Sequence, residues 1–459
     1  MRARLTSLLV FSSLTIVPVA VAAAQSAGQP SVPAAQQPRA QAPVAAAPAP
    51  VQQPQAQAPV AVPQAQAAPL VPPPPPPLWT ALDANQLLMA ILNSSKEGLD
   101  PRDYDAVGLL AAMRSGNPAL MSAAATERFN KLSSDFALGH VRGADRQNWH
   151  IPDRDLDEAR QDQLLRYALA QNRVGEALAG LLPTHPQYAA LKKALEVTPK
   201  AETAKVDRIR LNMDRWRWLP RDLGERYIIV NVPAYTAALV EKGVTLSRHR
   251  AVAGAIRTPT PQLMATATGV ILNPWWEVPK SIEPEVRGRR GYVAVRNERG
   301  DVIRWRQPPG PANALGQIKF VMPNPQAIYL HDTTAKGLFD AKARAYSHGC
   351  IRTEHIMLLA ERLLTDGAAE QVAAEGAEAP TVWTPEKIKA AVASKKTVQA
   401  NFPKPLPVYI IYMSSAALAD GSVKDYADIY KKDGKVLAAL NDVAPKGPAE
   451  KPKDKVASR

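Results

Sequence analysis

The hydrophobic pattern of the chain changes its period near Lys200, and this change strongly constrains the fold. Before it, apolar residues recur at the three- to four-residue spacing of an amphipathic helix. After it, short runs rich in β-branched residues alternate with Pro- and Gly-rich turns, which is typical of strands. Helices followed by strands predict an α+β protein, with an α-helical domain ahead of a mostly-β domain.

The helical domain is expected to span residues 78–200. One face of its first helix carries apolar residues at helical spacing, namely Leu87, Leu88, Ile91 and Leu92. Asp100 and Pro101 then supply the cap and the first-turn proline that are typical of a helix start. This part contains no catalytic group of residues, so we expect the chemistry further along the chain.

The mostly-β domain is expected to span residues 205–435. Short apolar segments with the composition of strands lie at residues 227–232, 237–240, 243–246, 269–272, 318–321, 328–330 and 408–412. Residues 354–364 have helical periodicity instead. The pattern predicts a domain built mainly from strands with a helix late in its sequence.

The sequence predicts that both ends of the chain lie outside the globular domains. Residues 1–24 begin with two arginines, continue through an apolar stretch and close on three alanines, which is typical of a cleaved secretory signal peptide. A membrane anchor fits less well, because the apolar run is short and contains a proline. Residues 25–77, rich in Ala, Pro and Gln, and the Lys-rich residues 436–459 are expected to be disordered. We therefore expect export to the periplasm, with the first of these segments as a linker.

The single cysteine and the net charge limit the classes of function that the chain can have. Cys350 is the only cysteine, so an exported chain carries a thiol that cannot form an internal disulfide. The formal net charge of +14 suits a polyanionic cell wall or membrane surface as well as nucleic acid. Export and the lack of a nucleic-acid-binding motif argue against nucleic acid.

The segment from Ser347 to Arg352 carries the most specific signal. A cysteine beside a histidine and ahead of helix-forming sequence is expected to favour the thiolate. Gly349 permits a tight turn that aims backbone N–H groups at one point, which is how an oxyanion hole is built. His331 ends a predicted strand and could serve as the base, so the sequence predicts nucleophilic acyl transfer by Cys350.

Two other interpretations of these residues are weaker. Cys350 could be a buried structural thiol, but its histidine and glycine neighbours argue against that. A metal site would use His331, His348, Cys350 and His355, whose spacing matches no structural zinc pattern. No metal and no cofactor are therefore expected.

The same residues match the signature of the L,D-transpeptidase family: a His, a spacer, then Ser-His-Gly-Cys, an apolar residue and Arg. Fifteen residues separate His331 from Ser347, which fits the family. Further segments resemble its scaffold-bearing, YcbB-like Gram-negative branch, at residues 212–220, 231–233, 273–279, 306–311 and 313–316. That branch often carries a small peptidoglycan-binding module ahead of the catalytic domain, for which this sequence leaves no room.

The resemblance implies a YkuD-type catalytic domain acting in peptidoglycan biosynthesis and cell shape. Cys350 would attack the diaminopimelate carbonyl of a tetrapeptide stem and release D-Ala, and an amine would then resolve the thioester as a 3-3 cross-link. His331 would act as base, with its ring oriented by a main-chain carbonyl of the loop that begins at Asp332.

The resemblance also implies the rest of the site. Backbone N–H groups of His348, Gly349 and Cys350 would hold the oxyanion, and residues 280–306 would form a flap. Substrate contacts would come from Arg352, Tyr329, Trp276 and Ser347. Donor and acceptor stem peptides are the implied partners, a wall-attached protein is a further candidate acceptor, and carbapenems are the implied inhibitors.

Two rival functions stay open at this point. Hydrolysis of the same acyl-enzyme would make the protein an L,D-carboxypeptidase or an amidase. A different class is a wall-binding scaffold without catalysis, which the intact His331 and Cys350 argue against, because binding alone needs no thiol.

Overall fold

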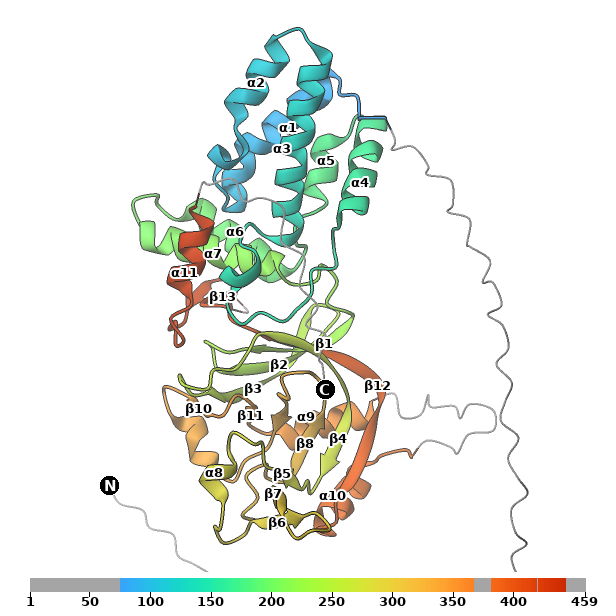
Figure 1. The fold of residues 1–459 in the computed structure, drawn as a ribbon, viewed down its shortest axis with the longest axis vertical. Helices are drawn as coiled ribbons and strands as arrows, with labels where there is room; N and C mark the ends of the chain where they lie inside the picture. The colour runs from blue at the N-terminus through green and yellow to red at the C-terminus, as the bar shows by residue number, and fades with distance from the viewer. Residues whose placement is uncertain (1–74, 367–380, 419, 443–459) are drawn as a thin grey trace, which may run out of the picture. The chain divides into compact units, whose positions relative to one another are not determined.

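The computed structural model of the 459-residue chain describes residues 75–366, 381–418 and 420–442, which lie in one compact unit, Pro73–Arg459 (Figure 1). The predicted signal peptide, nearly all of the predicted linker and the chain after residue 442 lie outside the described residues. Among the described helices, none has both the length and the hydrophobicity needed to cross a bilayer.

The N-terminal part is helical, as the periodicity predicts. Its elements are α1 (Ala81–Asn93), η1 (Ser94–Glu97), η2 (Pro101–Tyr104), α2 (Ala106–Arg114), α3 (Pro118–Leu138), η3 (Gly143–Arg146), α4 (Glu158–Ala170), α5 (Val174–Ala179) and α6 (Pro186–Val197). Thr80 forms a capping box with Asp83, which starts α1. Leu87 and Ile91 are fully buried in the helical core, whereas Leu92 points outward and is half-exposed.

Helix α7 (Thr203–Arg217) lies within the predicted β domain, yet it packs on the helices. The carboxylate of Asp214 is fully buried and accepts the backbone N–H groups of His140 and Val141 and the indole N–H of Trp218. A buried carboxylate is stable only when its oxygens are satisfied in this way. These bonds attach α7 to the end of α3, so the helical region extends to Arg217.

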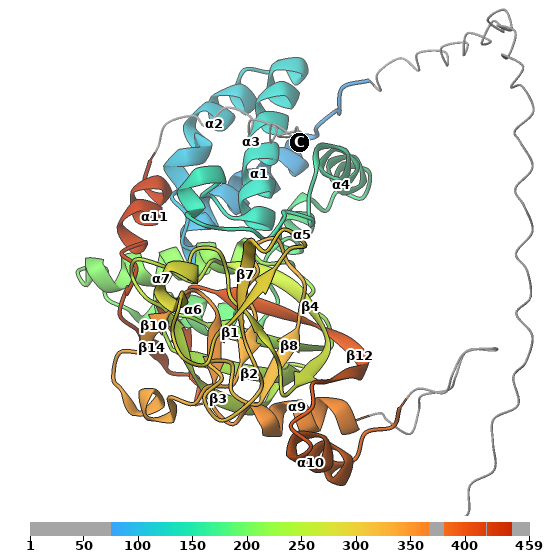
Figure 2. The same cartoon turned by 60° about the horizontal axis from the view of Figure 1, so that its bottom comes forward.

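A nine-stranded sheet forms the second part (Figure 2). Its strands are β1 (Arg226–Asn231), β2 (Thr236–Glu241), β3 (Val244–Gly254), β4 (Leu263–Leu272), β8 (Ile318–Val321), β9 (Leu330–His331), β10 (Ala345–Ser347), β11 (Ile351–Thr353) and β12 (Val398–Ile411). The order is β10-β3-β11-β9-β8-β4-β12-β1-β2, and β2 also pairs with β3. This extra pairing closes the sheet into a barrel-like form.

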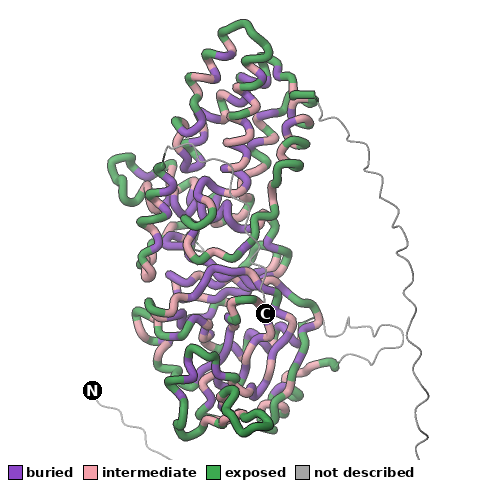
Figure 3. Tube along the Cα trace, viewed as in Figure 1, coloured by how far each residue is buried: buried purple, intermediate pink, exposed green. Residues whose placement is uncertain are grey.

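Buried residues run along most strands of the sheet (Figure 3), and the apolar ones among them form one core in its interior. Helix α9 (Ile356–Thr365) contributes its apolar face to this core, and α10 (Pro385–Ala393) adds the buried Ile388. Strand β12 is much longer than the predicted 408–412. Its first half contains prolines that hide the strand pattern, and the register shifts between Asn401 and Leu406 to accommodate them.

The predicted flap is a small separate sheet. Strands β5 (Trp276–Glu277), β7 (Val302–Gln307) and β6 (Val293–Arg296) pair in that order, and the short helix α8 (Glu283–Val286) covers them. Val278, Ile282 and Val286 form a core of their own.

The C-terminal segment differs from the prediction. Strands β13 (Ser415–Ala417) and β14 (Val423–Asp425) form a hairpin, and helix α11 (Asp433–Leu440) follows. The predicted disorder from residue 436 is wrong for residues 436–440, because Val436 and Leu440 are buried in the core of the helical domain. Asp433 also forms an ion pair with the buried Arg215 over 2.8 Å.

Candidate active site

Two short neighbouring strands position the predicted catalytic residues. β11 pairs in parallel with β9, with Ile351 opposite Leu330, and both side chains are fully buried in the core. Side chains alternate between the faces of a strand, so the residues on either side of this pair point to the other face. These are Tyr329, His331, Cys350 and Arg352.

His331 lies between two cations in the sheet. Arg352 is its partner on β11, and Lys319 is its partner on β8. Adjacent strands are about 4.8 Å apart, so both positive side chains start close to the imidazole. The sequence pattern gave no reason to select Lys319, because the pairing of β8 with β9 is not visible in the sequence.

The four side chains line a cavity of about 190 Å³. Trp276 and Ile282 of the flap form another part of its wall. In the paired strands, Cys350 lies beside Tyr329 and diagonally across from His331, and such diagonal neighbours have Cα atoms about 7–8 Å apart. The cavity therefore exposes the thiol and the imidazole to one bound molecule.

The structure changes the electrostatic interpretation of Cys350. The residue is half-buried, and its thiol donates to the Ala327 carbonyl with an S···O distance of 3.8 Å. Burial raises the pKa of Cys350, although hydrogen bonds from Tyr329 and the charges of Lys319 and Arg352 act in the opposite direction. The predicted helix-assisted thiolate is wrong, because strand β11 follows Cys350 and α9 begins only at Ile356.

His331 is fixed in one orientation. Its Nδ1 lies 2.5 Å from the Asp332 main-chain oxygen, so Nδ1 carries the proton and donates it, and Nε2 is the acceptor. This is the orienting carbonyl that the resemblance implies. Burial, followed by the positive charge of Arg352, lowers the pKa of His331 to about 3. The ring is therefore neutral near pH 7 and can accept a proton.

In the loop before Cys350, residue 349 has a backbone conformation that favours glycine, and Ser347 makes its hydrogen bonds within the loop. Gly349 has φ +116°, and a Cβ there would lie 3.1 Å from Ile328 Cδ1. Ser347 Oγ donates to the Cys350 carbonyl over 2.6 Å and accepts the Gly349 N–H over 3.1 Å.

Two predicted roles change as a result. Ser347 lines the cavity as predicted, but it is largely buried and its hydroxyl also holds the loop, which makes it a positioning residue as well. The Gly349 N–H is already engaged by that hydroxyl. The N–H groups of His348 and Cys350 make no hydrogen bond to any other described residue and are the better oxyanion donors.

Residues far away in the sequence support this loop. Thr260 Oγ1 donates to the Gly349 carbonyl over 2.8 Å and accepts the Gly254 N–H over 2.9 Å. Tyr430 Oη donates to the Gly254 carbonyl over 2.6 Å. Sequence reasoning missed Thr260 and Tyr430, because no local pattern marks them.

The flap contacts the same loop. His348 Nε2 lies 3.0 Å from Glu285 Oε1 on α8, so its side chain points to the flap and not to the thiol. Trp276 of the flap and Tyr329, the two predicted groove residues, both line the cavity. Trp275 instead stacks under the guanidinium of Arg306, 4.2 Å from its ring centroid.

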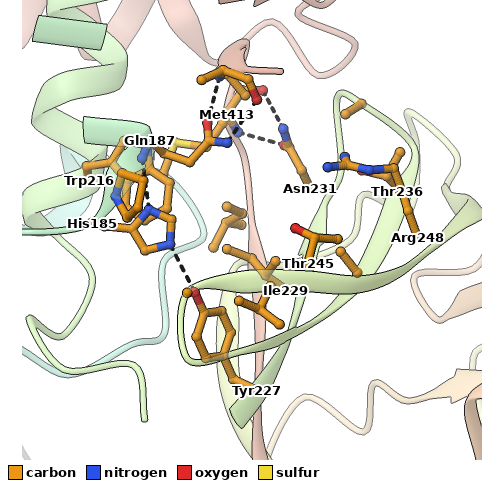
Figure 4. A pocket seen from close by; sticks show the side chains of 18 of the residues that line it. His185, Gln187, Trp216, Tyr227, Ile229, Asn231, Thr236, Thr245, Arg248 and Met413 are labelled. Carbon is orange, nitrogen blue, oxygen red and sulfur yellow. Dashed lines mark hydrogen bonds between the residues drawn. The ribbon is translucent and has the colours of Figure 1, made fainter. Parts of the chain in front are cut away.

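A further cavity of about 130 Å³ lies between helices α6 and α7 and the strands β1 to β3 (Figure 4). His185 stacks on Trp216, with ring centroids 4.3 Å apart, and lies 2.9 Å from Tyr227 Oη. Burial lowers the pKa of His185 to about 4. Among the residues that the structure describes, no cysteine, serine, aspartate or glutamate lines this cavity, so it is a poor candidate for acyl transfer. Across the described ranges, no three His, Cys, Asp or Glu residues are grouped as metal ligands.

Comparisons with known proteins agree with both parts of the fold. Residues 225–385 match the family model of the L,D-transpeptidase catalytic domain, YkuD, and residues 75–195 match that of a Scaffold domain. A Haemophilus influenzae protein named "Putative L,D-transpeptidase" is 26% identical over 408 residues, which cover 80% of this chain and 77% of that protein.

Solved structures of L,D-transpeptidases are more distant. One from Mycobacterium smegmatis is 12% identical, over 41% of this chain and 58% of that chain, with a TM-score of 0.20. A mutant enzyme from Enterococcus faecium is also 12% identical, over 42% of this chain and 52% of that chain, with a TM-score of 0.21. The match spans just over half the length of these two structures.

Proposed function

We propose that the chain is a cysteine acyltransferase that forms 3-3 cross-links in peptidoglycan, because residues 225–385 match the L,D-transpeptidase catalytic-domain model and residues 75–195 match that of a Scaffold domain. One observation carries the proposal. Cys350 and the oriented, neutral His331 lie on one face of two paired strands and line one cavity.

The first step is acylation. Cys350 Sγ attacks the diaminopimelate carbonyl of a tetrapeptide stem while the thiol proton passes to His331 Nε2. The N–H groups of His348 and Cys350 hold the oxyanion. As the intermediate collapses, the amide C–N bond breaks, His331 returns the proton to the leaving nitrogen, and D-Ala departs. Since both groups are neutral at rest, the proton moves during the attack and not before it.

The second step transfers the acyl group. An amine attacks the thioester, the C–S bond breaks, and His331 moves a proton from the amine to the departing sulfur. The product is a new amide joining two stems. Water in place of the amine would release a tripeptide stem, which is the L,D-carboxypeptidase outcome.

The remaining elements fit a peptide substrate in the wall. Arg352, which lines the cavity and whose guanidinium makes no ion pair within the described residues, supplies a charge for a substrate carboxylate. Tyr329 and Trp276 form apolar walls for the stem. The site of action is the periplasm, and the strained carbonyl of a carbapenem acylates Cys350 in place of the stem.

Product analysis tests this proposal. The full chain is incubated with disaccharide-tetrapeptide muropeptides, and the products are separated and weighed. We expect dimers lighter than two tetrapeptides by one D-Ala, and none with Cys350→Ala. Tripeptide monomers alone would replace the transpeptidase assignment with a hydrolase, and unchanged tetrapeptide would contradict both.

A further inference from the structure

The junction cavity is the hollow of about 130 Å³ between helices α6 and α7 and strands β1 to β3 (Figure 4). Strand register builds its floor. Ile229 on β1 pairs with Ala238 on β2, and Ala238 pairs in turn with Arg248 on β3. Residues that pair directly point to the same face of a sheet, and all three of these side chains line the cavity. An apolar floor therefore leads to a guanidinium.

Arg248 marks the solvent side of the cavity. Its side chain is exposed and makes no hydrogen bond and no ion pair with the described residues. Figure 4 places it across the cavity from Trp216 and His185. No acidic side chain among the described residues lines the cavity, so nothing there neutralises this charge. A guanidinium in this position favours an anion, and its planar fork matches a carboxylate.

Two buried donors without acceptors lie on the other side. Trp216 is buried, and its indole N–H has no hydrogen-bond partner in the described part of the chain. His185 Nδ1 accepts the Gln187 N–H over 3.1 Å, so Nε2 carries the proton and donates to Tyr227 Oη over 2.9 Å. The hydroxyl proton of Tyr227 then has no acceptor among the described residues. Buried donors without acceptors are costly, so both favour a ligand that brings an oxygen.

The volume limits the size of that ligand. An apolar cavity of about 150 Å³ holds one molecule of benzene. We propose that the junction cavity is a binding site for a small monocarboxylate whose apolar body is about one ring in size and carries a second, uncharged oxygen. The carboxylate pairs with Arg248, and the apolar body lies on Ile229 and Ala238. The second oxygen accepts from Trp216 and Tyr227.

This site is separate from acyl transfer. Among the described residues, none that lines the junction cavity also lines the cavity of Cys350. The inference therefore does not depend on the proposed function, and each can fail without the other.

Calorimetric titration of the full-length protein with 4-hydroxybenzoate tests the inference. 4-Hydroxybenzamide lacks the charge, and benzoate lacks the second oxygen. We expect 4-hydroxybenzoate to bind with a Kd about 10- to 100-fold lower than the amide, the range for a charge-assisted hydrogen bond. Its Kd should also be about 2- to 10-fold lower than that of benzoate, the range for a neutral hydrogen bond.

Variants assign each contact to its residue. Arg248→Gln should raise the Kd of 4-hydroxybenzoate to that of the amide and leave the Kd of the amide unchanged, and Arg248→Lys should restore part of the preference. Trp216→Phe keeps an aromatic ring but removes the N–H, so it should reduce the advantage of 4-hydroxybenzoate over benzoate. Arg114→Gln is the matched control. Arg114 is an exposed arginine at the end of α2 that forms no ion pair within the described residues and does not line the cavity.

Three results would overturn the inference. The first is that none of the three compounds binds, and the second is that the carboxylate and the amide bind equally. The third is that Arg114→Gln weakens binding as much as Arg248→Gln, which would reduce the effect to net charge. Equal Kd values for 4-hydroxybenzoate and benzoate would remove the second oxygen from the assignment. Each of these results leaves the proposed function standing, because cross-linking is measured separately on muropeptides.

Discussion

Thr260→Val isolates what one buried hydroxyl contributes to the catalytic loop. Thr260 has no exposed surface, and its hydroxyl joins the Gly254 N–H to the Gly349 carbonyl. Valine has nearly the same shape but leaves both backbone groups without this partner. Each buried group deprived of its hydrogen bond costs about 1–3 kcal/mol, so the free energy of unfolding should fall by about 2–6 kcal/mol.

The same substitution should slow acylation. The Gly349 carbonyl and the Cys350 N–H belong to one peptide unit, so rotation of that unit turns a proposed oxyanion donor away from the substrate. Loss of one such donor costs about 10²- to 10³-fold in kcat. Urea unfolding followed by tryptophan fluorescence gives the stability, and intact-protein mass against time gives the acylation rate.

Thr258→Val is the matched control. Its hydroxyl donates to the Ser347 carbonyl over 3.0 Å, but that carbonyl also accepts the Ala255 N–H over 2.7 Å. We therefore expect a loss below about 1 kcal/mol and a near-normal acylation rate. If the two valine variants behave alike, the support assigned to Thr260 is refuted.

Further predictions concern titration, strain and the C-terminal helix. Alkylation of Cys350 by iodoacetamide should rise with pH with a midpoint above that of an unperturbed cysteine thiol, because burial raises the thiol pKa; a midpoint below that of an unperturbed thiol would show a preformed thiolate. Folding lowers the pKa of His331 from 6.5 to about 3, so between these pH values the unfolded chain binds more protons than the folded one, and the free energy of unfolding falls as pH drops below 6.5. The urea midpoint of His331→Gln should therefore fall less steeply with decreasing pH than that of the wild type. Identical slopes for the two proteins would contradict this. Gly349→Ala should lower stability by about 1–3 kcal/mol and abolish acylation, because φ is +116°; an active, equally stable variant would disprove the strain. Leu440→Ala should lower the free energy of unfolding, measured in urea, by about 2–5 kcal/mol, because the side chain is buried in the helical core. An unchanged urea midpoint would instead support the prediction that this segment is disordered.

The sequence predicted features that depend on local pattern. Residues 318–321 match β8, and the helical periodicity of residues 354–364 matches α9 within two residues. His331 ends its strand as predicted. These features follow from period and composition, which a short window of sequence contains.

Features that depend on pairing could not be predicted. Ile351 and Thr353 looked like the start of a helix, but their β-branched side chains belong to a three-residue strand held by β9 and β3. Lys319 gained its place beside His331 only through the register of β8 and β9. Val436 lies in the core of a helical domain that ends more than 200 residues before it, and no local window reports such a contact.

The most direct test of the acyl-transfer mechanism is the mass of the protein during reaction with a tetrapeptide stem. The account predicts an adduct equal to the stem without D-Ala, located on the peptide that contains Cys350, and formed about 10²- to 10⁴-fold more slowly in His331→Gln. An adduct on another residue, or a His331→Gln variant that acylates at the wild-type rate, would contradict it.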